Sequence, residues 1–228
     1  MDKALLDKIV PLTAIQKQHF KIMDQGQYQY HLNGESTDIQ EPWQILENGN
    51  LQIVRSVRYS EKYRVKLSVV AHISDGNQVV DISYSEGDSP DINAEYRIDG
   101  QGNWKVTQSH PGDIFQQHGC VEGLVIFPLL RIFSGTMLQD CKIDNGQQKQ
   151  VLVPDIRLAT RYNDKLKPSF DLRKTKSLGT NGKGKKLSFT SEHYQEDQAE
   201  FYLNKLGQLS QYCWQQKPDV HWQVYLVK

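Results

Sequence analysis

Alternation of apolar and polar residues between positions 63 and 73 limits this chain to a fold that is rich in β-strands. Side chains two positions apart on a strand point to the same face of a sheet, so the pattern predicts a strand with one buried face. The same pattern occurs in residues 51–59 and, after the turn signal Asp75-Gly76-Asn77, in residues 80–84. The predicted buried positions of the first strand are Tyr63, Val65, Leu67, Val69, Ala71 and Ile73.

Hairpin signals continue along the rest of the chain. Residues 92–98 alternate up to the turn Asp99-Gly100-Gln101-Gly102, and the alternation resumes at Asn103. This regular spacing of short strands predicts a mainly β fold, namely an antiparallel β-barrel or roll of about 9 to 12 strands. Further strands are predicted over residues 149–158, 168–178, 185–192, 198–205, 208–214 and 219–227.

The first 24 residues follow a helical period instead. Residues of one stripe recur every three or four positions, which places them on one face of a helix. We therefore expect an N-terminal helical segment in residues 1–24 that packs on a β-roll body of residues 43–227; a lid or a membrane-touching segment is the alternative role. The 228 residues contain no linker, which predicts a single domain, 1–228. The stripe consists of Leu5, Ile9, Leu12, Ile15, His19 and Ile22.

Charge and hydrophobicity exclude several partners. Lys plus Arg and Asp plus Glu both number 27, so the formal net charge is zero and no overall field attracts nucleic acid. The longest apolar run, residues 124–133, is interrupted by Pro128 and Arg131 and is far shorter than the roughly 20 residues of a membrane-spanning helix. We expect no nucleic-acid partner and no stable membrane insertion, and the sequence leaves the oligomeric state unknown.

The cysteines and the N-terminus indicate a reducing compartment. Cys120, Cys141 and Cys213 are too widely spaced for a disulfide framework or a paired zinc site, so reduced thiols are expected. The first residues carry charges among their apolar side chains, unlike a signal peptide. A cytoplasmic location is therefore expected.

Four residues of metal-binding type fall close together in the sequence: His110, Asp113, His118 and Cys120. Residues 110–113 are typical of a turn, in which Asp and Gly occur for backbone reasons. No catalytic motif surrounds Cys120 or His118. We therefore predict no metal, no cofactor and no catalytic residue, with a hydrolase or isomerase that uses a site near His118 and Cys120 as the alternative.

Basic residues cluster around the turn dipeptide Asn181-Gly182. One interpretation is a local patch that contacts phosphate or an anionic head group, and the other is a solvated hairpin. The cluster consists of Arg173, Lys174, Lys176, Lys183, Lys185 and Lys186.

The most apolar part of the chain, Val121–Arg131, is predicted to be a buried core strand. In the alternative interpretation, Glu122 and Arg131 are polar groups at the edge of an apolar cavity. Such a composition is expected where a pocket binds an amphiphile, and barrels of moderate size can hold such a cavity.

Five stretches between Tyr96 and Lys217 follow one another in a distinctive order. They are Tyr96-Arg-Ile-Asp-Gly-Gln-Gly-Asn-Trp104-Lys-Val, Gly119-Cys-Val-Glu122, Pro128-Leu-Leu-Arg131, Val151-Leu-Val-Pro-Asp-Ile156 and Phe201-Tyr-Leu-Asn-Lys-Leu-Gly-Gln-Leu-Ser-Gln-Tyr212. This order of features resembles a bacterial glycolipid-binding family, whose members have a largely β, barrel-like roll. The resemblance implies binding of a lipid or glycolipid without catalysis. It places Glu122 and Arg131 near the ligand, and it assigns Trp104 and Tyr212 mainly to packing.

Three functions remain open at this point. The first is non-enzymatic binding of a lipid-type or glycolipid-type amphiphile in a β-roll cavity. The second is the enzyme near His118 and Cys120, and the third is an interaction module with a filled core. Unfilled volume among the inward-facing positions distinguishes the first from the third.

Overall fold

The computed structural model describes residues 7–13, 17, 19–141, 149–157, 159–182, 184–191 and 199–228. The fold is mainly β, as predicted, and these residues form 15 strands of one sheet, more than the predicted number. Most predicted strands are confirmed, whereas β1, β2 and β8 were not predicted. The strands are β1 (Lys21–Leu32), β2 (Glu35–Asn48), β3 (Leu51–Ser60), β4 (Val65–Ser74), β5 (Asn77–Glu86), β6 (Ile92–Ile98), β7 (Asn103–His110), β8 (Asp113–Cys120), β9 (Val125–Ile126), β10 (Lys149–Pro154), β11 (Pro168–Asn181), β12 (Gly184–Ser191), β13 (Glu200–Leu203), β14 (Leu209–Lys217) and β15 (Val220–Val227).

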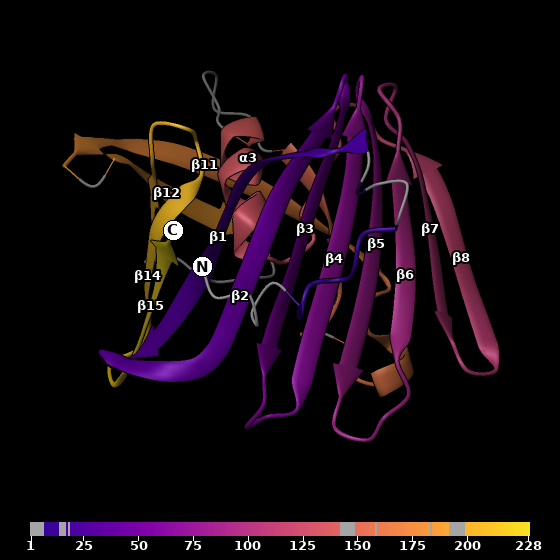
Figure 1. Ribbon diagram of the computed structural model, residues 1–228, viewed down its shortest axis with the longest axis horizontal. Coiled ribbons are helices and arrows are strands. Elements are labelled where there is room, and N and C mark those ends of the chain that lie inside the picture. The colour runs from indigo at the N-terminus through magenta and orange to yellow at the C-terminus, as the bar shows by residue number, and fades with distance from the viewer. Residues whose placement is uncertain are drawn as a thin grey trace.

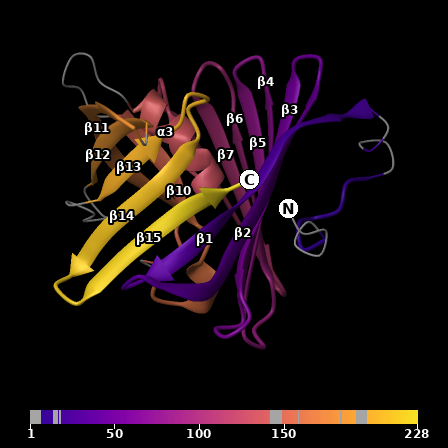
Figure 2. The same cartoon turned by 60° about the vertical axis from the view of Figure 1, so that its left-hand side comes forward.

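The strand order shows how one sheet encloses an interior. Strands β1–β8 pair in sequence as an antiparallel meander; the chain then crosses to the opposite edge, where β9 runs parallel to β10. Strands β10–β15 return one by one until β15 pairs with β1. In Figures 1 and 2 the long strands β2–β8 form one wall and β10–β15 form the other. Within the described residues β8 and β9 do not pair with each other, so the sheet is an open roll and not a closed barrel.

Tight turns set the register of the long hairpins. At Asn33-Gly34 and at Asp75-Gly76 both residues have a positive φ, between 44° and 84°. Two such residues in succession give the turn whose twist matches that of two paired strands, and Asn-Gly and Asp-Gly adopt it most readily. The predicted turn at Asp75 is confirmed, and a one-residue slip there would move the whole buried face of β4 to the outside.

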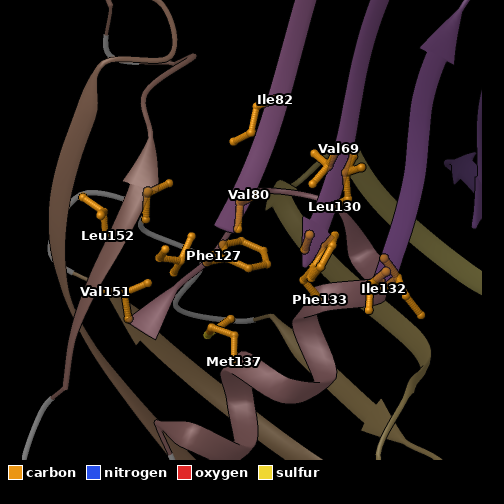
Figure 3. Packing of buried hydrophobic residues seen from close by; sticks show 14 of the residues in the cluster. Val69, Val80, Ile82, Phe127, Leu130, Ile132, Phe133, Met137, Val151 and Leu152 are labelled. Carbon is orange, nitrogen blue, oxygen red and sulfur yellow. The ribbon is translucent and has the colours of Figure 1, made fainter. Parts of the chain in front are cut away.

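A short helical segment fills the space between the two walls. The 3-10 helix η1 (Arg131–Phe133) leads directly into α3 (Ser134–Asp140), which lies inside the roll (Figure 2). Apolar side chains of this segment and of the chain before it lie between those of β4 and β5 and those of β10 (Figure 3). Figure 3 labels Phe127, Leu130, Ile132, Phe133 and Met137 from this inner part, and Val69, Val80, Ile82, Val151 and Leu152 from the walls. No helix among the described residues is long and apolar enough to cross a membrane.

The prediction of a core strand over Val121–Arg131 is wrong for most of that range. Only Val125–Ile126 pair as a strand, and the chain turns at Leu129, which has a φ of +66°. Pro128 lacks the N–H that a continued strand would use. A short apolar run fits a buried strand and a buried helix equally well, which is why the pattern misled.

The described part of the N-terminal segment differs from the predicted helix. Residues 7–13 are irregular, Lys17 and His19 are helical, and Lys21 begins β1; the remaining residues of 1–18 lie outside the described part. Residues 9–13 run along the outer face of the sheet (Figure 1), where Nη1 of Arg55 donates a hydrogen bond of 2.7 Å to the Val10 carbonyl. The β-roll body therefore begins at residue 21 and not at 43.

Side chains bridge the two walls on the side of the unpaired edges. The loop after β10 contains the 3-10 helix η2 (Tyr162–Asp164). Its Leu166 carbonyl accepts a hydrogen bond of 2.7 Å from the hydroxyl of Tyr96 on β6. On β7 the Trp104 ring packs edge-on against Phe170 of β11, with 5.1 Å between the ring centroids. These side-chain contacts connect the two walls at the edges where β8 and β9 are not paired.

Candidate ligand-binding site

A cavity of about 360 Å³ lies inside the roll, between the inner helical segment and the two walls. Tyr63, which is 61% exposed, and the exposed Arg157 mark its mouth, whereas Leu67 and Met137 are buried. Most of its described lining is apolar, and the charged side chains among these residues are all arginines. The apolar lining consists of Ile39, Val65, Leu67, Phe127, Leu129, Met137, Ile156 and Phe201, and the arginines are Arg58, Arg131, Arg157 and Arg173.

A fully buried carboxylate, Glu41 on β2, orients Arg58 on β3. The Nη2 atom of Arg58 lies 2.7 Å from Oε2 of Glu41 and donates a hydrogen bond of 2.9 Å to the carbonyl of Leu129. Glu41 also accepts hydrogen bonds from the Tyr30 hydroxyl and from the backbone N–H of Arg131. The guanidinium therefore has a fixed position at the cavity wall, because a buried charge needs such partners.

Tyr30 contributes to the same network in its neutral form. Burial raises the pKa of Tyr30 well above its ordinary value, because the charged phenolate would lose its hydration. The neutral hydroxyl can then donate a hydrogen bond of 2.5 Å to Oε2 of Glu41. The guanidinium of Arg58 lies 5.2 Å from the centroid of the Tyr30 ring, which adds a cation–π contact.

A second buried pair holds Arg173 on β11. Its Nε atom lies 2.7 Å from Oδ2 of Asp171, and both side chains are almost completely buried. Ser191 donates a further hydrogen bond of 2.6 Å to the same carboxylate. The guanidinium of Arg173 lies 5.0 Å from the ring centroid of Phe127, so its charge reaches an otherwise apolar part of the cavity wall.

Arg131 starts the inner helical segment and also lines the cavity. Its guanidinium lies 3.9 Å from the ring centroid of Tyr212, a buried residue of β14. Arginine stacks on an aromatic ring through the flat face of its guanidinium, while its N–H groups point outward in the guanidinium plane. Tyr212 thus sets the orientation of a cavity arginine.

Ser134, the first residue of α3, is also part of the cavity wall. Its side chain is fully buried, and its Oγ has no hydrogen-bond partner within the described residues. A buried hydroxyl without a partner costs about 1–3 kcal/mol. A polar atom of a ligand would satisfy it.

The structure brings together only part of the predicted site. Arg131 lines the cavity and Tyr212 supports it from behind. Trp104 packs on Phe170 between the walls and does not line the cavity. Glu122 is exposed in the loop after β8, away from the cavity wall, so it does not share a site with Arg131.

The second sequence-based candidate lies on the outermost strand, β8. His118 and Cys120 are both exposed there, two residues apart, at a Cα separation of about 7 Å for an extended strand. His110 and Asp113 flank the β7–β8 turn, with 3.6 Å between Nε2 and Oδ2. In the described part of the chain no three His, Cys, Asp or Glu side chains converge as a metal site would require. None of the three cysteines, all of which lie in the described part of the chain, forms a disulfide.

The basic cluster is divided between two environments. Arg173 points into the roll and pairs with Asp171, so it is not part of a surface patch, contrary to that interpretation. Lys174 and Lys176 are exposed, and Lys186 forms an ion pair of 2.7 Å with Glu200; Lys183 lies outside the described residues. Residues 168–191 form the β11–β12 hairpin, as the turn signal predicted.

A larger hollow of about 590 Å³ lies on the outer face of the sheet, beneath residues Val10–Thr13. Serine, threonine, asparagine and acidic side chains contribute much of its lining, and the N-terminal segment already covers it. Apolar walls with a few polar groups are typical of small-molecule sites. We therefore regard the inner cavity as the better candidate.

The sequence did not predict Glu41, Arg58 or Ser134 as site residues, and it placed Arg173 in a basic cluster around the Asn181-Gly182 turn. The available signal was the strand register, because Glu41 shares the inward-facing positions of β2 with Ile39 and Trp43. A charged residue at a core position that lacks an obvious structural role indicates a paired or functional group. The signal was not readable while β2 itself was not predicted.

These observations define an open β-roll with an apolar inner cavity whose charged groups are arginines. No family model matches the chain, and a search of curated proteins finds no match, so the resemblance to a glycolipid-binding family stays a prediction. Among solved structures the chain is similar to a β-barrel-like protein of the domain of unknown function DUF1849 from Brucella abortus. The identity is 8% and the TM-score 0.46, with 91% of this chain and 98% of that chain covered.

Proposed function

We propose that this protein binds a lipid-type or glycolipid-type amphiphile in its inner cavity and performs no chemistry on it. The observation that carries the proposal is the unfilled, mainly apolar volume of about 360 Å³ inside the roll. Small-molecule sites occupy about 300–1,000 Å³ and have apolar walls with a few placed polar groups. The unfilled volume favours a binding protein over an interaction module with a filled core.

The wall chemistry supports a ligand with an apolar and a polar part. Each methylene group that leaves water for an apolar wall contributes about 0.8 kcal/mol, so a short alkyl chain would gain several kcal/mol next to Leu67, Phe127 and Met137. The same wall carries guanidinium groups and the Ser134 hydroxyl, which favour a polar head. Within the described residues the Ser134 Oγ has no hydrogen-bond partner, and a purely apolar ligand would not supply one.

The enzyme alternative near His118 and Cys120 has less structural support. Both side chains are exposed on an edge strand, and neither lines the inner cavity. Nucleophilic catalysis requires a base within hydrogen-bond reach and a shielded pocket. We therefore favour binding over catalysis.

The proposal can be tested by native mass spectrometry of the purified protein, together with titration of a fluorescent fatty-acyl probe. We expect a lipid adduct, or saturable probe binding that an unlabelled acyl ligand displaces. Absence of both an adduct and displaceable probe binding would exclude the proposed function.

A cavity-filling variant makes the test specific for the site. Met137→Trp places a larger ring in the cavity and should abolish probe binding, whereas Met23→Trp makes the same substitution at a position that is 51% exposed on β1 and should leave binding unchanged. If Met137→Trp does not fold, Leu67→Phe fills the cavity by a smaller step. Equal probe binding by wild type and a folded cavity-filling variant would contradict the proposal.

A further inference from the structure

The described charged side chains of the cavity wall all have the same sign. Among the residues described, its charged side chains are Arg58, Arg131, Arg157 and Arg173, and no Asp or Glu lines it. The carboxylates of Glu41 and Asp171 lie behind Arg58 and Arg173, where they fix the two guanidinium groups from the side of the protein core. Within the described residues the cavity wall therefore carries positive groups and no negative ones.

Two contacts fix the position of Arg131 at the cavity wall. The Tyr212 ring supports its guanidinium at 3.9 Å, and its backbone N–H is bonded to Glu41, so both ends of the residue are held. A guanidinium matches a carboxylate or a phosphate through two parallel N–H···O bonds, which few other side chains can provide.

Ser134 provides a second, independent observation on the same wall. It follows Arg131 by three residues, is fully buried and lines the cavity, and its Oγ has no hydrogen-bond partner in the described part of the chain. A hydroxyl can donate to an anionic oxygen, and such charge-assisted bonds are stronger than neutral ones. Arginine and a donor hydroxyl together fit an acidic group.

We propose that the ligand is an acidic amphiphile, whose carboxylate or phosphate head group binds Arg131 and Ser134 while its alkyl part lies against Leu67, Phe127 and Met137. This inference rests on the proposed function and specifies its ligand class. It separates acidic lipids and acidic glycolipids from neutral and cationic ones.

Three ligands with the same ten-carbon chain test the inference: decanoate, 1-decanol and decyltrimethylammonium. Each is titrated, below the concentration at which it forms micelles, against wild-type protein loaded with the fluorescent fatty-acyl probe. Because a charge-assisted hydrogen bond is lost with the neutral head, decanoate should bind about 10-fold or more tightly than decanol. The cation should bind most weakly.

Variants locate the selectivity. Arg131→Gln should remove most of the preference for decanoate over decanol while decanol affinity stays within about 2-fold, and Arg131→Lys should keep part of the preference because it keeps the charge. Ser134→Ala should weaken decanoate alone. The matched control is Arg97→Gln, since Arg97 is exposed on β6, pairs with Glu95 and does not line the cavity.

The outcomes separate the inference from the proposed function. If decanol binds as tightly as decanoate, the acidic-ligand inference is wrong although binding of an amphiphile stands. If none of the three ligands displaces the probe, the proposed function itself fails. Inorganic phosphate is the last ligand to be tested. If phosphate displaces the probe at the same concentration as decanoate, the site binds a free anion and the proposal of an acidic amphiphile is wrong. If Arg131→Gln does not fold, the two variants Ser134→Ala and Arg131→Lys still test the assignment. A preference for decanoate that is unchanged in both single variants would show that Arg131 and Ser134 do not bind the head group.

Discussion

Glu41 and Arg58 form an ion pair across β2 and β3 that also fixes the inner segment of the roll. The Nη2 atom of Arg58 lies 2.7 Å from Oε2 of Glu41 and donates a hydrogen bond to the Leu129 carbonyl. Glu41 in turn accepts a hydrogen bond from the backbone N–H of Arg131. This buried pair thus holds Leu129 and Arg131, which are two of the cavity residues on the inner segment.

Replacement of Glu41 should therefore cost a large part of the stability. Glu41→Gln leaves Arg58 without its counter-ion, and the loss of one partner of a buried pair typically costs about 3–5 kcal/mol. We expect about 3 kcal/mol, since the Arg58 side chain is 27% exposed. Urea unfolding followed by tryptophan fluorescence measures the difference. Glu95→Gln, at a more exposed pair, is the control and should cost less than about 1 kcal/mol.

The contact between Lys165 and Glu86 should give a pH-dependent contribution to stability. The hydrogen bond from Lys165 lowers the pKa of Glu86 in the folded state. The contribution is therefore complete above the ordinary glutamate pKa of about 4.3 and is lost as the pH falls through the lower folded-state value. Solvent screens this half-exposed carboxylate, so Glu86→Gln should cost under about 1 kcal/mol at pH 7 and progressively less as the pH falls below the ordinary glutamate pKa of about 4.3. A cost that does not decrease as the pH falls through this range would contradict this assignment.

The cysteines should differ sharply in their reactivity. Burial raises the pKa of the Cys141 thiol to about 11, and its side chain is inaccessible, whereas Cys120 is exposed on the edge strand. Because the thiolate is the reactive form, iodoacetamide at pH 8 should alkylate Cys120 in the native protein and Cys141 only after unfolding. Peptide mass spectrometry reads both sites. Alkylation of native Cys141 as fast as Cys120 would be inconsistent with the position of Cys141 beneath β11.

Trp104 should stabilise the packing of the two walls against each other without contributing to ligand selectivity. Removal of a large buried ring costs about 3–5 kcal/mol, and here it also removes the contact with Phe170 across the unpaired edges. We expect Trp104→Ala to lower the unfolding free energy by about 3 kcal/mol while the ratio of decanoate to decanol affinity is unchanged. Trp222→Ala, which removes a half-exposed ring on β15, should cost less. A changed affinity ratio in Trp104→Ala would mean that Trp104 belongs to the site.

The strands from β3 to β7 and from β10 to β15 were predictable because their residues alternate and their turns carry Asp-Gly, Asn-Gly or similar signals. β1 was not predicted although Tyr28 and Tyr30 alternate with glutamines, because its first residues were assigned to the helical stripe that ends at Ile22. β2 was not predicted because Pro42 interrupts it, and a proline argues against a central strand. α3 was missed for a different reason. Its seven residues are too few for a helical period to emerge, and its position depends on contacts with both walls.

The candidate site was predictable only at one residue. Arg131 was found because it ends an apolar run, whereas Glu122, at the other end of the run, turned out to be exposed. Glu41 and Arg173 reach the interior from strands far apart in the sequence. Their role depends on how the two walls of the roll face each other, and no local sequence pattern predicts that arrangement.

The most direct test of the central claim is a crystal structure of the protein with 10-bromodecanoate, whose anomalous signal locates the end of the alkyl chain. We predict a bromine peak inside the roll, near Leu67, Phe127 and Met137, with the carboxylate next to Arg131. A bromine peak in the outer hollow beneath Val10–Thr13, or an inner cavity without ligand in crystals that bind it elsewhere, would contradict the account.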